Sequence, residues 1–212
     1  MSCSNKGLAN ELRHLGGSAR VSAGVDLYLH VQTSLDAIRL VELGARATLV
    51  QQLTGLERKV IKRFYRQHNG QPSPAGQMPF SDAWYRKDIR RMLHASVIWQ
   101  LYKQPVKMER TKARELIDLY EGYLGLVKEP LLNITRASFV PLLVAMDVWR
   151  EHKCTHCRAQ YLVSVAGSGI ICPGCTLYYR HRCQQCGTAM EVTRQGRYRK
   201  SCDACKPSQD QL

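Results

Sequence analysis

Eight of the nine cysteines in this chain stand in four Cys-x-x-Cys pairs, all within its C-terminal third. Two consecutive pairs, separated by a loop long enough to form a hairpin, make a four-thiolate zinc pattern. Such a closed sulfur set leaves no open position for a substrate, so the metal is expected to be structural rather than catalytic. We therefore predict two zinc ions per chain, with these ligands: Cys154, Cys157, Cys172 and Cys175 in the first quartet, and Cys183, Cys186, Cys202 and Cys205 in the second.

Disulfide bonds and a redox dithiol are the alternatives to zinc. Nothing at the N-terminus resembles a secretory signal, and disulfides are rare in the cytosol. A redox Cys-x-x-Cys motif normally occurs once, beside a βαβ unit, and that context is absent from the pattern. Cys3 is left over and is predicted to be a free thiol. Cysteine usage thus favours a cytoplasmic, metal-binding protein.

The two quartets form an internal repeat, because equivalent cysteines are 29 or 30 positions apart. Within the first repeat, Tyr161, Val163 and Val165 alternate with small or polar residues, which predicts a strand. We expect this strand to turn at residues 167–169 and to return through residues 170–171. Both repeats are interpreted as zinc ribbons, in which metal replaces the hydrophobic core that so few residues cannot build.

A net charge of +14 and a pI near 9.6 indicate a polyanionic partner, chiefly DNA or RNA. An anionic membrane surface is the competing partner. The most apolar segment, residues 131–149, is interrupted by Asn133, Arg136, Pro141 and Asp147, so it is expected to be a buried helix and not a membrane span. We therefore expect a nucleoid-associated protein with no membrane segment.

The predicted fold class is mainly α, with a helical DNA-binding domain followed by two small zinc-ribbon-like units. The expected parts are an N-terminal arm or loosely packed helix (1–33), a helical domain for DNA and partner binding (34–150), the first ribbon (151–182), the second ribbon (183–206) and a tail (207–212). Ser34 is the expected N-cap of the first core helix. A loop at 69–80 separates it from further helices at about 82–103, 107–127 and 130–149.

Residues 47–66 can be arranged as a helix-turn-helix, with Thr54, Gly55 and Leu56 in the turn. The second helix repeats apolar residues at helical spacing, and we expect these to pack inward: Val60, Ile61, Phe64 and Tyr65. Its basic residues would face outward and contact DNA: Arg58, Lys59, Lys62, Arg63 and Arg66. The second ribbon supplies further candidate DNA contacts: Arg194, Arg197, Arg199 and Lys200. A solvated basic surface is the alternative interpretation for both sets.

These residues resemble the FlhC family of bacterial flagellar transcriptional activators. The resemblance covers about residues 35–176 and rests on these segments: 39–46, 53–56, 61–65, Pro74, Gly76, 78–81 with Trp84, 129–132 with 135–137, and the first cysteine quartet. It implies a helical, zinc-containing, non-enzymatic protein that binds promoter DNA in a hetero-oligomer with an FlhD-like subunit. The metal-binding role carries over to the first quartet. The longer N-terminal arm and the second quartet depart from the family pattern.

The apolar residues of 131–149 cover more than one face of a helix, so we expect either a buried core helix or a surface for the FlhD-like partner. Two copies of the chain per hetero-oligomer would place two basic helices along one face of the duplex. The alternative function is a zinc-ribbon adaptor that binds proteins and uses its charge only for solubility. Catalysis is disfavoured, because the histidines are scattered and no triad-like arrangement accompanies them.

Overall fold

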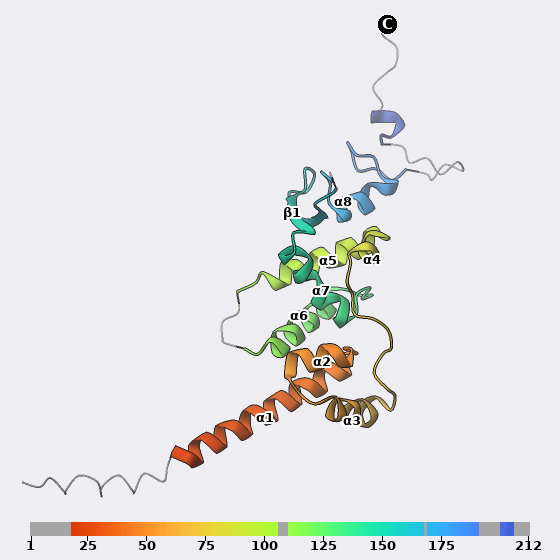
Figure 1. Ribbon diagram of the computed structural model, residues 1–212. Helices are drawn as coiled ribbons and strands as arrows, with labels where there is room; N and C mark the ends of the chain where they lie inside the picture. The colour runs from red at the N-terminus through yellow and green to blue at the C-terminus, as the bar shows by residue number, and fades with distance from the viewer. Residues whose placement is uncertain (1–17, 106–109, 168, 191–199, 206–212) are drawn as a thin grey trace, which may run out of the picture. The chain divides into compact units, whose positions relative to one another are not determined.

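The computed structural model describes residues 18–105, 110–167, 169–190 and 200–205, with the side chains of the first helix described from residue 27 onward. The chain forms two compact units. The N-terminal unit comprises Met1–Pro74 with Lys112–Arg114, and the C-terminal unit comprises Ala75–Thr111 with Glu115–Leu212. Helices dominate both units, so the predicted mainly α fold is confirmed (Figure 1). Within the described ranges, no helix combines the length and apolar composition that crossing a bilayer requires.

The N-terminal unit is built from three helices: α1 (Ser18–Glu42), α2 (Ala47–Thr54) and α3 (Arg58–Asn69). Each helix contacts the other two. Helix α1 ends at Glu42, and Gly44 follows with a φ of 76°, the left-handed conformation that glycine adopts without strain. The amide of Ala45 then donates to the Leu40 carbonyl at 2.9 Å, which satisfies one of the carbonyls exposed at the helix end.

The predicted N-cap at Ser34 is wrong. Ser34 lies inside α1, and its hydroxyl donates to the His30 carbonyl one turn earlier at 2.9 Å. A serine can use its hydroxyl in this way inside a helix as well as at its start, so the residue type alone does not mark the boundary.

Four helices of the C-terminal unit precede its cysteines: α4 (Ala83–Arg86), α5 (Ile89–Tyr102), α6 (Lys112–Leu126) and α7 (Ile134–Ala145). Helix α5 is central, because it contacts α4, α7, a strand and the cysteine-bearing helix α8 (Pro173–Tyr178). The helix predicted at 82–103 is therefore two helices. Asp88 breaks it, since its extended backbone and its carboxylate, which accepts from the Arg90 amide, cap the start of α5.

The helix predicted at 130–149 is shorter than expected. Asn133 caps α7 by accepting a hydrogen bond from the Arg136 amide, and the helix ends at Ala145. Trp149 begins strand β1 (Trp149–Lys153) instead of ending the helix. Asp147, with a φ of 54°, lies between the two elements and redirects the chain.

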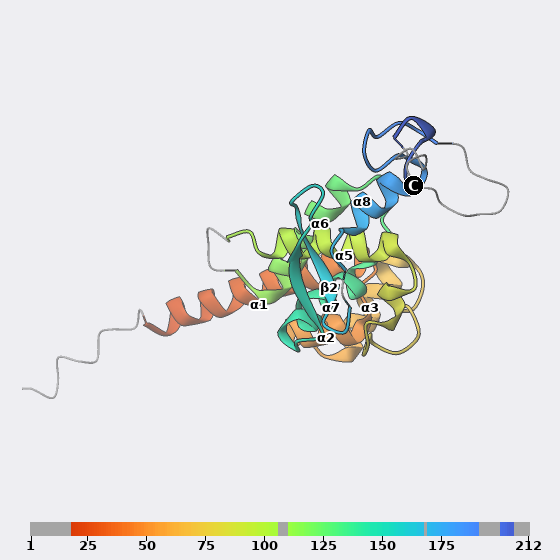
Figure 2. The ribbon, with the colours of Figure 1, turned by 90° about the horizontal axis from the view of Figure 1, so that it is seen from above.

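Strand β1 pairs antiparallel with β2 (Gln160–Ser164), which Figure 2 labels. In this register Trp149 lies opposite Ser164. The strand predicted around Tyr161 is thus confirmed, but its expected partner at residues 170–171 is wrong. The pairing partner precedes the first cysteine. Two short 3₁₀ segments, η1 (Tyr179–His181) and η2 (Asp203–Cys205), complete the described elements.

Polar contacts fasten this hairpin to the helices. The buried Trp149 indole donates to the Asp82 carboxylate at 3.1 Å. The Leu162 amide donates to the Ser96 hydroxyl on α5 at 3.0 Å, in a buried position. Lys103, the residue that follows α5, forms an ion pair with Glu151 on β1. The hairpin therefore belongs to the core of the C-terminal unit and is not an appended loop.

Tyr123 on α6 is the most highly bonded buried side chain near this core. Its hydroxyl accepts from the amides of Leu131 and Leu132 at 3.1 and 3.2 Å and lies 2.6 Å from His94 Nδ1. With two amides donating to it, the hydroxyl donates its own proton to His94. Burial and the nearby Arg90 lower the pKa of His94, which is consistent with a neutral, accepting imidazole.

Replacing Tyr123 by Phe should reduce the free energy of unfolding of the C-terminal unit by about 2 kcal/mol, because two amides and the His94 ring nitrogen lose their partner. Urea unfolding followed by tryptophan fluorescence measures this, since all three tryptophans lie in that unit. Tyr102→Phe is the matched control, because Tyr102 is 53% exposed. Equal stability of the two variants would contradict the role given to the Tyr123 hydroxyl.

Candidate metal centres and basic helix

The first quartet gathers four sulfurs from two turns. Cys154 and Cys157 follow β1, whereas Cys172 and Cys175 bracket the start of α8. All four sulfurs lie within 4.8 Å of one another, and Cys157 Sγ is 3.6 Å from Cys172 Sγ. Backbone amides support the cluster, since the Cys172 amide donates to Cys154 Sγ at 3.2 Å. The predicted quartet is therefore assembled in space as well as in sequence.

The second quartet repeats this construction. Its sulfurs also lie within 4.8 Å of one another, with 3.6 Å between Cys186 Sγ and Cys202 Sγ. Three backbone hydrogen bonds of the first ribbon recur 29 or 30 positions later with equal lengths, to within 0.1 Å: Cys154–Ala159, Arg158–Cys154 and Thr155–Ile170 correspond to Cys183–Thr188, Gly187–Cys183 and Gln184–Lys200. The internal repeat in the sequence is thus a repeat of structure.

The same backbone turn follows the first cysteine pair of each repeat. Arg158 and Gly187 occupy equivalent positions there, with φ angles of 61° and 74°. Glycine adopts this left-handed conformation freely, whereas an arginine is strained in it. The first ribbon thus holds a less favourable residue in the same turn, which its additional packing can support.

The electrostatics of both quartets favour a bound cation. Burial opposes ionisation of Cys154, but amides of Cys172, Cys157 and His156 direct their hydrogens at its sulfur and lower its pKa to about 6. Amides of Cys186 and Cys202 likewise lower the pKa of Cys183 to about 6.

The last cysteine of each quartet behaves in the opposite way. Burial and the neighbouring thiols raise the pKa of Cys175, and hydrogen bonds with Cys202 and Cys186 raise the pKa of Cys205 to about 12. Four sulfurs this close can all be thiolates only if a positive ion offsets their mutual repulsion.

The donor sets fit a tetrahedral ion. A Zn–S distance of about 2.3 Å places the sulfurs of a regular tetrahedron about 3.8 Å apart. One sulfur pair in each quartet has a separation of 3.6 Å, which is close to that value. Four thiolates select thiophilic ions over Mg²⁺ or Ca²⁺, which prefer oxygen. Both clusters can therefore hold a metal ion, and neither leaves a position for a substrate.

Helices α2 and α3 form the predicted helix-turn-helix. Gly55 connects them with a φ of 69°, and its amide donates to the Gln51 carbonyl at 2.9 Å. Thr54 closes the turn, since its hydroxyl donates to the Val50 carbonyl and accepts from the Leu56 amide. The turn is thus defined by local bonds that the sequence already implied.

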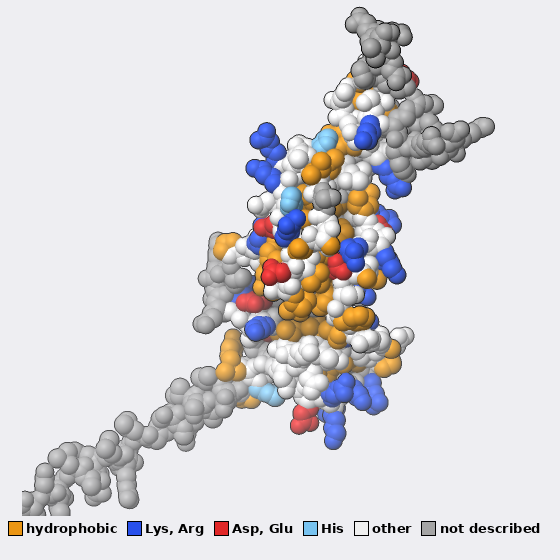
Figure 3. Space-filling model, turned by 45° about the horizontal axis from the view of Figure 1, so that its top comes forward, with side chains coloured by type: hydrophobic (Ala, Val, Ile, Leu, Met, Phe, Trp, Pro, Cys, Tyr) orange, Lys and Arg blue, Asp and Glu red, His pale blue; other side chains and the backbone are white. Residues whose placement is uncertain are grey.

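The basic side chains of α3 are all exposed: Arg58, Lys59, Lys62, Arg63 and Arg66. At 100° per residue, the last four fall within an arc of about 100° opposite the buried face. Figure 3 shows Lys and Arg side chains gathered over α3 at the bottom of the view. Among the described residues, no acidic group forms an ion pair with any of the five.

The apolar face of α3 is narrower than predicted. Ile61 and Tyr65 are buried at 0% and 1% exposure and Phe64 is half-buried, but Val60 is 37% exposed. The inward placement of Val60 is therefore wrong. Ile61 and Tyr65 are four residues apart and define the buried stripe, whereas Val60 lies about 100° to one side of Ile61.

Three of the four DNA contacts predicted in the second ribbon fall outside the described residues. Arg194, Arg197 and Arg199 lie outside the described residues, and Lys200 is exposed. The Lys200 carbonyl accepts from the Gln184 amide at 2.9 Å, so its backbone belongs to the frame of the second quartet. Lys200, Arg180 and His156 are among the residues that line a cavity of about 410 Å³.

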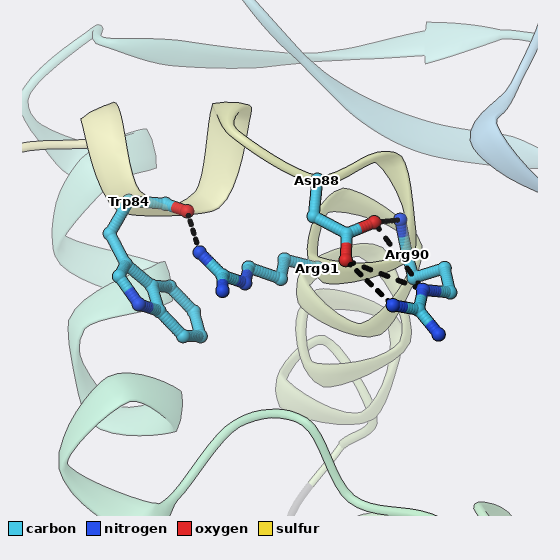
Figure 4. A network of polar contacts seen from close by, with 4 residues as sticks. All are labelled: Trp84, Asp88, Arg90 and Arg91. Atoms are coloured by element: carbon cyan, nitrogen blue, oxygen red, sulfur yellow. Dashed lines mark hydrogen bonds and ion pairs between the residues drawn. The ribbon is translucent and has the colours of Figure 1, made fainter.

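Several arginines of the C-terminal unit are already engaged. Figure 4 shows Arg91 beside Trp84, where the guanidinium lies 4.0 Å from the ring centre and donates to the Trp84 carbonyl at 2.9 Å. Arg136 lies 4.4 Å from the same ring, and Arg90 pairs with Asp88 at 3.1 Å. These groups stabilise the α4–α5 corner. In contrast, the charges on α3 remain available to a ligand.

The apolar surface expected on residues 131–149 is largely buried. Ile134, Val140 and Leu143 are at most 1% exposed, whereas Leu142 and Met146 are each 53% exposed. The core-helix alternative therefore describes most of α7.

A larger apolar surface was missed on α1. Its exposed residues are Leu27, Tyr28, Leu29, Val31 and Leu35, at 48–68% exposure. Their helical spacing is visible in the sequence, but the glycines and polar residues that precede them obscured it. Leu27, Val31 and Leu35 recur every four residues, which is the spacing of one helix face.

Comparison with known proteins gives a match to one family model, described as "Flagellar transcriptional activator (FlhC)", over residues 27–181. The match covers more than half of the chain. It includes α2, α3 and the first quartet, and it ends before Cys183, the first ligand of the second quartet.

Individual relatives agree with this match, and each is named Flagellar transcriptional regulator FlhC. The chain is 30% identical to the protein from Variovorax paradoxus over 146 residues, covering 66% of this chain and 72% of the relative. It is 28% identical to the Enterobacter cloacae protein, over 60% of this chain and 70% of the relative. It is 27% identical to the Paraburkholderia phymatum protein over 186 residues, covering 83% and 77%.

Metal retention should depend on pH. Protons compete with the ion for the thiolates, so metal should be kept at pH 8 and released progressively as the pH falls into the acid range. The lowered pKa values of Cys154 and Cys183 favour retention near neutral pH. Metal analysis after dialysis over this range measures the loss. Cys157→Ser should remove one metal equivalent at pH 8, whereas Cys3→Ser, outside both quartets, should remove none. Full metal content in Cys157→Ser would contradict the first site.

Proposed function

The chain belongs to the FlhC family of flagellar transcriptional activators, and from this premise we propose that it activates flagellar and other operons by binding promoter DNA through α3, in a hetero-oligomer with an FlhD-like subunit. The family is one of transcriptional regulators and not of enzymes. The proposed site of action is the nucleoid. The single observation that carries the DNA-binding proposal is the exposed basic face of α3 in a helix-turn-helix.

A duplex offsets the repulsion within this face. Four of the basic side chains project from one side of α3, so they repel each other in free solution, and a phosphate backbone supplies the opposite charge. Lysine contacts phosphate as a point charge, whereas arginine can also bind a guanine edge through two hydrogen bonds. Arg63 and Arg66 are thus our candidates for base contacts, and Lys59 and Lys62 for phosphate contacts. Arg194, Arg197, Arg199 and Lys200 of the second ribbon are proposed as additional phosphate contacts.

Zinc is the proposed ion in both quartets, giving two per chain. The support is the donor set of four thiolates with near-tetrahedral sulfur separations. Zinc would bind Cys154, Cys157, Cys172 and Cys175 in the first ribbon and the equivalent four cysteines in the second. When bound it supplies cross-linking and no chemistry, because every coordination position is filled by sulfur. In the first ribbon the cross-link would hold residues 155–171 as a closed loop beside the hairpin.

The exposed stripe of α1 is the proposed contact for the FlhD-like subunit. Leu27, Val31 and Leu35 expose roughly half or more of their surface in a row along one helix. A partner helix with an apolar face would cover this row by helix-on-helix packing. Two copies of this chain around the partner would present two α3 helices to the duplex, as symmetric regulators do.

Replacing Lys62 and Arg66 together by Ala should weaken binding to promoter DNA. It should flatten the dependence of log K on log salt by about one unit, because one phosphate contact is lost, and it should relax sequence specificity, because one base contact is lost. Fluorescence anisotropy with a labelled promoter fragment, at several salt concentrations and with the partner present, measures both effects. Lys128→Ala is the matched control, since Lys128 is an exposed basic residue after α6 in the other unit.

The double variant Lys62→Ala/Arg66→Ala excludes α3 as the DNA interface if it keeps its helix content and binds DNA with the same affinity and salt slope as the unmodified chain and the control. Retention of partner binding together with absence of any duplex binding would instead favour the adaptor function.

The partner contact is tested by Val31→Glu with Leu35→Glu, which places two charges in the proposed apolar interface. Co-purification with a co-expressed FlhD-like subunit should be lost, and the isolated chain should bind promoter DNA more weakly than the complex. Leu126→Glu is the control, because Leu126 is 66% exposed on α6 in the C-terminal unit. A double variant that still forms the complex at full yield would place the partner elsewhere.

A further inference from the structure

The two metal clusters have the same frame but different surroundings. In the first quartet, Cys154, Cys172 and Cys175 are at most 9% exposed and form a buried cluster with Tyr161. Val163, Ile171 and Tyr179 pack against this cluster. Three of the four sulfur ligands are therefore enclosed largely by apolar side chains, whereas the fourth, Cys157, is exposed.

The first ribbon is also bonded to the rest of its unit. Its strand β2 donates to Ser96 of α5, and its helix α8 contacts the same helix. At Gly174, between the last two ligands, a Cβ would lie 3.6 Å from Leu93 Cδ1 of α5, so the backbone already approaches this helix closely. Opening the first cluster would therefore require separating it from α5 as well as releasing the ion.

The second quartet lacks this protection in the part of the chain that the structure describes. Cys186 is exposed, and Cys202 and Cys205 are half-buried. Cys183 is buried, and among the described residues from 183 to 205 it is the only one that is. No described apolar side chain of this ribbon is buried over the sulfurs. In the described part of this ribbon, Cys186, Cys202 and Cys205 are therefore accessible to solvent.

A small ribbon without a core is folded mainly by its metal. The free energy needed to open it is then close to the free energy of metal release alone, whereas a packed ribbon must also lose its apolar contacts. A competing ligand can moreover attack an exposed thiolate before the ribbon opens. Both effects act in the same direction, toward faster exchange at the second site.

We infer that Cys183, Cys186, Cys202 and Cys205 form an exchangeable site for a thiophilic divalent cation, which empties and unfolds the second ribbon while the first site stays loaded. This inference rests on the proposed zinc binding. The second ribbon lies beyond the residues matched to the family. Its folding would depend on the concentration of available metal. Helix α3 belongs to the other compact unit, so the exchange leaves the helix-turn-helix folded.

The test uses the full-length chain, with its partner subunit if that is needed for solubility, loaded with two equivalents of zinc. An excess of the chromogenic chelator 4-(2-pyridylazo)resorcinol reports zinc release by absorbance. We expect two phases of one equivalent each, separated in rate by roughly tenfold or more. Cys186→Ser with Cys202→Ser should remove the fast phase and leave the slow phase unchanged. Cys3→Ser, outside both quartets, should retain both phases.

Thiol alkylation read by mass spectrometry provides a second measurement on the unmodified chain. In the presence of chelator, Cys186 and Cys202 should be alkylated before Cys157 and Cys172. A single release phase of two equivalents, loss of the slow phase in the double variant, the reverse order of alkylation, or only one bound zinc would each overturn the inference. A chain that fails the α3 test yet shows two phases would reject the DNA interface and leave the exchangeable site standing.

Discussion

Attachment of the first ribbon to α5 is the constraint on which the C-terminal unit depends. The strand pair β1–β2 is short and could not persist alone in water. It persists because the Ser96 hydroxyl accepts a hydrogen bond from the buried Leu162 amide of β2, and because the adjacent cysteine cluster closes the loop that follows. Asp82 anchors the other end through the Trp149 indole. The cysteine cluster, the hairpin and α5 thus stabilise one another, because each covers apolar surface of its neighbours.

Some basic side chains of this protein are engaged in contacts within the fold, whereas others are exposed and available to a ligand. The excess of +14 indicates a polyanionic partner, but it does not say which residues would meet it. Arg91 and Arg136 stack on Trp84, and Arg90 neutralises Asp88, so they contribute to the fold of the α4–α5 corner. The Lys and Arg side chains of α3 have no such partners among the described residues. A basic sequence becomes a basic surface only where the fold leaves its charges unpaired.

Comparison of the two ribbons distinguishes what the cysteine spacing determines, which is the backbone geometry, from what the neighbouring elements determine, which is the burial of the sulfurs. Matching hydrogen bonds 29 or 30 positions apart show that the cysteine spacing alone specifies the knuckle and its returning loop. Burial differs because the first repeat is preceded by β1 and covered by α5, whereas nothing described covers the second. Equal sequence motifs can therefore hold a metal with the same geometry and release it at different rates.

Features decided by nearby residues were predictable: the two quartets, the mainly α fold and the turn at Gly55, each of which depends on a few consecutive positions. Features decided by distant partners were not. Strand β2 pairs with β1 rather than with residues 170–171, Ser34 lies within a helix, and Val60 lies outside the buried stripe. The hairpin illustrates this, because Trp149 bonds to Asp82 and Leu162 bonds to Ser96, both far away in the chain. Apolar area and buried hydrogen bonds gained through such contacts can exceed local preferences of about 1 kcal/mol, and a local pattern does not show them.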